Sequence, residues 1–200
     1  METLTLAAVF FVAAYLLKSH AQKKRIRLLA SHLARYDIEK LMENLTEGYL
    51  RCLGEDDPAR RQQIWALLDD TADRLAAQIE RFAAEFARVD EAAARVSKLP
   101  LALPFALSLP GASFDMRRAL AIHARGIAEA AANTQQHTAK SKAYLMSAEL
   151  FLLQHTCHWY CRSKAVASAR MLAGHKTSYA QLIEAVAPAT RRDYLALVGR

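Results

Sequence analysis

One short stretch of the sequence concentrates side chains that could do chemistry. The four that could bind a metal lie within two helical turns, and they are His155, Cys157, His158 and Cys161. Cys157 and Cys161 are four residues apart, so on a helix they share a face. Thiolates and imidazoles are ligands that zinc and haem iron accept. The spacing, however, is neither Cys-x-x-Cys nor the Cys-x-x-Cys-His of covalent haem attachment. We therefore predict no bound metal and no cofactor, and a metal- or haem-responsive sensor remains an alternative hypothesis.

Other routes to catalysis have little support in the sequence. There is no Gly-rich phosphate loop, no HExxH motif and no GxSxG motif. A Cys–His nucleophile would need an activated thiolate and supporting acidic groups. After residue 100 the acidic residues are few, namely Asp115, Glu129, Glu149, Glu184 and Asp193. The sequence therefore predicts that the protein is not an enzyme and has no small-molecule substrate.

The elements that would position these side chains are helices. The 200 residues include only 6 glycines and 5 prolines, a composition that argues against an all-β fold and favours an all-α one. Hydrophobic residues recur at alternating spacings of three and four through residues 58–98, which predicts one long helix. We expect its hydrophobic stripe to be a partner interface made by Trp65, Leu68, Leu75, Ile79, Phe82, Phe86 and Val89.

A second helical pattern precedes this helix. It covers residues 25–53, allows a bend near Asp37, and ends at Gly54. The turn from Gly54 to Pro58 is short, and a short turn joins antiparallel neighbours. Residues 19–98 are therefore predicted to form a long antiparallel, coiled-coil-like hairpin.

The N-terminal residues suggest a location. Residues 4–17 (LTLAAVFFVAAYLL) carry no charge and are followed at once by basic residues. We predict a membrane-anchor helix over residues 1–18, with a cleaved signal peptide and a buried helix as alternatives. By the positive-inside rule, the N-terminus would lie outside a bacterial inner membrane and the bulk of the chain in the cytoplasm. The basic residues expected to contact anionic lipid are Lys18, Lys23, Lys24, Arg25 and Arg27.

An apolar loop separates the hairpin from the rest of the chain. Residues 99–112 contain three prolines, which exclude a regular helix. The loop either packs over the end of the helical bundle or dips into lipid headgroups. In the second case its membrane contacts would be Leu101, Leu103, Phe105 and Leu107.

The remainder is predicted as a long third helical region over residues 113–174 and two short helices over residues 175–200. Basic residues in this part suggest a further alternative, a membrane-tethered nucleic-acid-binding regulator. The turn between the two short helices contains Pro188 where a helix-turn-helix often has glycine, so nucleic acid is not the partner we expect.

These patterns combine into one functional hypothesis. The net charge of +7 allows an anionic lipid, a nucleic acid or an acidic protein as partner. The three cysteines are an odd number without framework spacing, which indicates free thiols. We predict a single-pass membrane-anchored scaffold, adaptor or small subunit of an inner-membrane assembly. It would act by protein–protein interaction and form a homo-oligomer or bind a protein partner through the helical rod.

Overall fold

The computed structural model describes residues 2–99 and 111–199 and confirms the predicted all-α class. Nine helices and one two-stranded sheet make up this described part of the chain. In order they are α1 (Glu2–Leu33), α2 (Ile38–Leu53), α3 (Pro58–Phe86), α4 (Glu91–Ala94), β1 (Arg95–Ser97), β2 (Ser113–Asp115), α5 (Met116–Ala132), α6 (Ala139–Cys161), α7 (Lys164–His175), α8 (Tyr179–Ala185) and α9 (Pro188–Val198).

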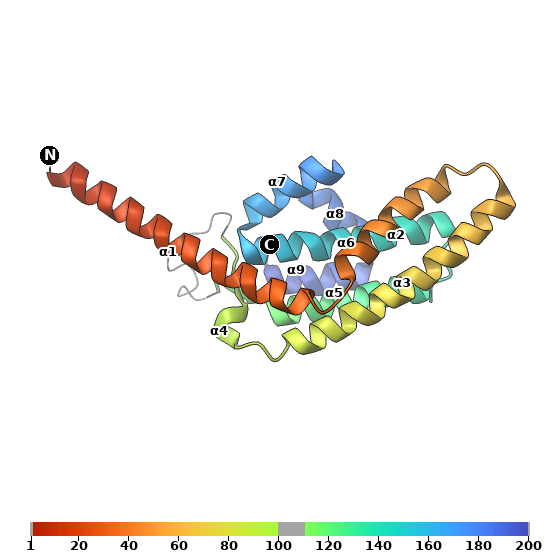
Figure 1. Cartoon of the computed structure of the whole chain (residues 1–200), viewed down its shortest axis with the longest axis horizontal. Coiled ribbons are helices and arrows are strands. Elements are labelled where there is room, and N and C mark those ends of the chain that lie inside the picture. Colours follow the sequence, from red (N-terminus) through yellow and green to blue (C-terminus); the bar gives the residue numbers. More distant parts are fainter. Residues whose placement is uncertain (1, 100–110, 200) are drawn as a thin grey trace.

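The helices form a bundle from which one helix projects (Figure 1). α3 packs against α2 and α5, α5 packs against α6 and α9, and α6 packs against α7 and α8. Only the C-terminal part of α1 joins the bundle, where Leu29 is buried. The N-terminal part of α1 extends away from every other helix (Figure 1).

Local signals explain where α2 and α3 begin. The side chain of Asp57 accepts a hydrogen bond from Ala59 N, and Pro58 occupies the first turn of α3, where its missing N–H costs nothing. The chain bends between α1 and α2, and there the backbone N–H of Asp37 donates to Gln78 Oε1 at 2.8 Å. This contact ties the bend to α3.

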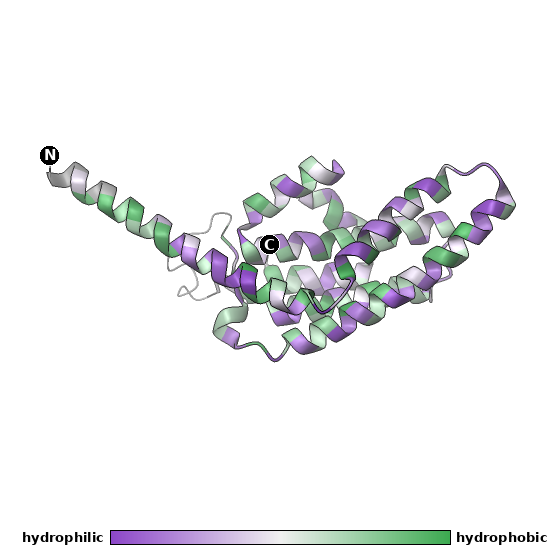
Figure 2. Cartoon of the chain, in the orientation of Figure 1, coloured by the Kyte–Doolittle hydropathy of each residue, from purple (hydrophilic) through white to green (hydrophobic). Residues whose placement is uncertain are grey.

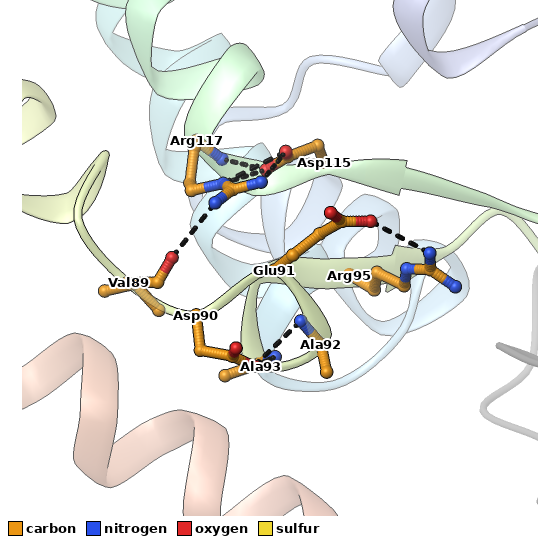
Figure 3. Close-up of polar contacts among 8 residues, drawn as sticks. All are labelled: Val89, Asp90, Glu91, Ala92, Ala93, Arg95, Asp115 and Arg117. Atoms are coloured by element: carbon orange, nitrogen blue, oxygen red, sulfur yellow. Dashed lines mark hydrogen bonds and ion pairs between the residues drawn. The ribbon is translucent and has the colours of Figure 1, made fainter.

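The helix predicted over residues 58–98 ends earlier than its hydrophobic pattern does. α3 stops at Phe86, and Asp90 then caps the short helix α4 through Ala92 N and Ala93 N. Arg117 holds the Asp115 carboxylate and also donates from Nη1 to Val89 O at 3.1 Å, as Figure 3 shows. These polar contacts, together with pairing of β1 and β2 in antiparallel register, replace the last turns of a continuous helix.

The region after residue 113 is likewise divided. Residues 113–115 form β2, and α5 ends at Ala132, capped by Asn133 in the left-handed conformation. The hydroxyl of Thr138 then accepts from Ser141 N and starts α6. At the end of the chain, α8 begins with a capping box between Ser178 and Gln181.

The predicted membrane anchor is wrong. Among residues 2–99 and 111–199, no helix contains a run that is long and apolar enough to cross a membrane. The uncharged run of residues 4–17 is 14 residues long, or about 21 Å of helix, whereas a bilayer core is about 30 Å thick. Lys18 ends this run. The single-pass topology and the inner-membrane location predicted from it are therefore wrong as well.

Candidate interaction surface

The projecting part of α1 exposes an unusual number of large apolar side chains. Each is at least 58% exposed, and they are Leu6, Val9, Phe10, Phe11, Val12, Tyr15, Leu16 and Leu17. They occupy all sides of the helix rather than one stripe, and Figure 2 shows mostly hydrophobic residues along this part of the ribbon. We call residues 5–17 the apolar arm. A helix that is hydrophobic all round is normally covered on all sides.

The area of the apolar arm is large for a single chain. At about 150 Å² for each buried aromatic ring, the 68–71% exposure of Phe10, Phe11 and Tyr15 corresponds to an area on the order of 300 Å². That alone equals the lower end of the largest apolar patch on a typical monomer, about 300–600 Å². The five exposed aliphatic side chains add to it, so the apolar arm is the size of a protein-binding surface.

A basic segment follows the apolar arm. Lys18, Lys23, Lys24 and Arg27 are exposed. Arg25 instead lies against α6, where its guanidinium carbon is 5.7 Å from the ring centroid of Tyr160. The lipid contacts predicted for these five residues depended on a membrane-spanning helix, and no such helix is found among the described residues. The structure places four of them as a charged collar between the apolar arm and the bundle.

Where α1 reaches the bundle, it forms one wall of an open groove of about 870 Å³. α2 and α6 form the other walls, and the lining includes Ile26, Leu33, Met42 and Leu153. Three acidic residues, Asp37, Glu39 and Glu43, and one basic residue, Lys40, also line it. We call this the α1–α2–α6 groove. Its volume falls in the range of roughly 300–1,000 Å³ that is typical of binding sites.

The thiols predicted as weak metal ligands line this groove. Cys157, His158 and Cys161 belong to its lining, whereas His155 contacts α7 and α8 through Ser168 and Tyr179. Burial raises the pKa of Cys161 to about 11 and also raises that of Cys157, so both thiols are protonated at neutral pH. Among the described residues, no group of three or more His, Cys, Asp and Glu side chains could hold a metal ion. The four candidates therefore do not converge on one point.

His155 belongs to a buried polar region that the sequence patterns did not identify. In this region His123 Nε2 lies 2.9 Å from Thr156 Oγ1, which is 3.0 Å from the hydroxyl of Tyr194. Nearby, Glu149 accepts a hydrogen bond from Ala187 N at 2.9 Å. The side chains of His123, Glu149, His155, Thr156 and Tyr194 are fully buried, so the region offers no open site, and His123 Nδ1, Glu149 Oε2 and His155 Nδ1 have no hydrogen-bond partner. Polar residues at core positions of a helical stripe were the only available signal, and helix periodicity alone does not pair them.

The partner interface predicted on the long helix is internal. Leu68, Leu75, Ile79, Phe82 and Phe86 are buried in the core, and Trp65 and Val89 are partly buried against it. α2 and α5 cover this face of α3. The stripe does face a helix, but the helix belongs to the same chain. Leu101, Leu103, Phe105 and Leu107, the predicted membrane contacts of the proline-rich loop, lie outside the described residues.

Comparisons with protein-family models, with curated proteins and with solved structures give no match for this chain.

Proposed function

We propose that this protein is a self-associating helical assembly protein that acts by protein–protein interaction through the apolar arm. The observation that carries the proposal is the exposure of large apolar side chains on every side of residues 5–17. Exposure of these side chains to water costs about 25 cal/mol of free energy per Å² of apolar surface. A second chain that covers the arm would remove this cost.

The shape of the chain supports this function. The arm projects from a bundle whose α2–α3 pair we interpret as a coiled-coil-like stiffening element (Figure 1). The collar of Lys18, Lys23, Lys24 and Arg27 separates the arm from the bundle, and charges of one sign favour an acidic surface as partner. The chain therefore combines a compact body with a single adhesive extension.

Sedimentation velocity of the full chain tests the proposal. We expect the unaltered protein to form dimers or larger species as its concentration rises. The double variant Phe10→Glu, Phe11→Glu should remain at the 22.3 kDa of one chain, because charges in the arm oppose its burial. The matched control Arg51→Glu, Arg60→Glu alters two exposed side chains far from the arm and should associate normally. An unaltered chain that stays monomeric throughout the titration would contradict the proposal.

A further inference from the structure

The α1–α2–α6 groove and the apolar arm have complementary properties. The groove wall on α1 comprises residues 26–34 and the wall on α6 residues 153–161. Each wall is nine residues long, or about 13 Å of helix. Residues 9–17, which carry seven of the eight exposed large apolar side chains of the arm, are also nine residues long. The groove is mostly apolar, as an acceptor for this segment would have to be.

The arm cannot fill the groove of its own chain. Residues 9–17 and residues 26–34 belong to the same uninterrupted helix, α1. A continuous helix keeps these two segments about 25 Å apart along its axis. Any arm that enters the groove must therefore come from another chain.

We propose that the α1–α2–α6 groove binds residues 9–17 of a second copy of this chain. This inference rests on the proposed self-association. The apolar side of the groove, with Leu33 and Met42, covers the phenyl rings of the incoming arm. Each copy carries one arm and one groove, so the contact closes into a dimer if two copies exchange arms. It grows into a head-to-tail chain if they do not.

Charge complementarity sets the direction of the incoming helix. Asp37, Glu39 and Glu43 line the α2 side of the groove with one basic residue, Lys40, so this side keeps an excess of negative charge, and Lys23 and Lys24 follow the arm. The incoming helix runs so that its basic collar lies beside α2. Opposite charges at the rim then contribute mainly to orientation and to the rate of association.

Mixing two variants tests this inference. The first is Phe10→Glu, Phe11→Glu, which has a blocked arm and an intact groove. The second is Ala30→Trp, which places a large ring at an exposed position of the groove wall and leaves the arm intact.

We expect each variant alone to sediment as a monomer, with the Kd of self-association raised about tenfold or more. An equimolar mixture should form a species of two chains, because one intact arm meets one intact groove. The control Ala66→Trp, at an exposed position of α3 outside the groove, should associate like the unaltered chain.

The outcomes separate this inference from the proposed function. If Ala30→Trp associates like the unaltered chain while the arm variant does not, arms bind elsewhere and the groove inference is overturned alone. If all proteins are monomeric, both proposals fail. Should Ala30→Trp lose its helical circular dichroism, Glu39→Lys with Glu43→Lys replaces it, since both side chains are exposed. That variant should weaken association, and Lys23→Glu with Lys24→Glu in the other chain should restore it. Failure of this restoration also overturns the inference.

Discussion

The apolar arm and the buried polar region invert the usual distribution of side chains in opposite ways. In the arm, Phe10 and Phe11 are 68% and 71% exposed, although aromatic rings are usually inside. Where α5, α6 and α9 meet, His123 and Glu149 are 0% exposed, although charged or titratable groups are usually outside. The chain supplies hydrogen-bond partners for His123 Nε2 and Glu149 Oε1 but not for His123 Nδ1 or Glu149 Oε2, whereas the large apolar side chains of the arm stay exposed. The buried region is part of the packed core, whereas the exposed arm is the region to which our proposal assigns self-association.

The largest expected effect comes from breaking the buried region at its centre. Thr156→Val keeps the shape of the side chain but leaves His123 Nε2 and the Tyr194 hydroxyl without their shared contact. We expect a loss of about 3 kcal/mol in the free energy of unfolding, because two buried polar groups lose a partner. Urea titration followed by circular dichroism measures it. Thr134→Val, at an exposed position, is the control and should change stability by less than about 0.5 kcal/mol. Equal effects at the two positions would show that the buried contacts contribute nothing.

A somewhat smaller effect is expected where the buried region depends on a glycine. A methyl group at Gly126 would collide with Thr190 Oγ1 and would lie 2.7 Å from Glu149 Oε2. Gly126→Ala should therefore destabilise the protein by about 2 kcal/mol, in spite of the better helix propensity of alanine. The control is Gly174→Ala in α7, where nothing lies within 4 Å. It should be neutral or stabilise by up to about 1 kcal/mol. Thermal unfolding distinguishes the two, and stabilisation by Gly126→Ala would refute the close packing.

Some features of this fold could be predicted from the sequence and others could not. Helix periodicity predicted an all-α fold and the bend near Asp37, because those depend on local spacing and capping. It did not predict that α3 ends at Phe86, since the end depends on Arg117 reaching Val89 from a distant part of the chain. The stripe on α3 was recognised as a packing surface, but the sequence alone does not say whether its partner helix is internal. The groove was missed for the same reason, since its walls come from three helices.

The pH dependence of stability tests whether the buried groups are uncharged. Burial lowers the pKa of His123 to about 3 and that of His155 to about 4, so stability is complete above pH 6.5 and is lost as the pH falls toward 4. Burial raises the pKa of Glu149 to about 7, so its contribution is complete below pH 4.5 and is lost as the pH rises through 7. The summed contribution of these three groups to stability is therefore greatest near pH 6.5.

Glu149→Gln isolates the carboxyl contribution. Glutamine cannot ionise, so the variant should gain stability relative to the unaltered chain by about 1 kcal/mol per pH unit between pH 5 and 7. Urea titrations at several pH values measure this difference. The exposed Glu80 of α3, which is not among the groups that act on Glu149, provides the control, and Glu80→Gln should follow the pH profile of the unaltered chain. A Glu149→Gln profile parallel to that of the unaltered chain would mean that Glu149 does not titrate in this range.

The smallest effect on stability is expected in the apolar arm, and it sharpens the contrast most. Leu16→Ser removes a side chain that is 59% exposed and contacts no core residue. In the monomeric Ala30→Trp background, the free energy of unfolding should change by less than about 0.5 kcal/mol. In the unaltered background the same substitution should weaken association measured by sedimentation. A change of 2 kcal/mol or more in the monomer would instead show that the arm packs within its own chain. Stability and association would then no longer be divided between the two regions.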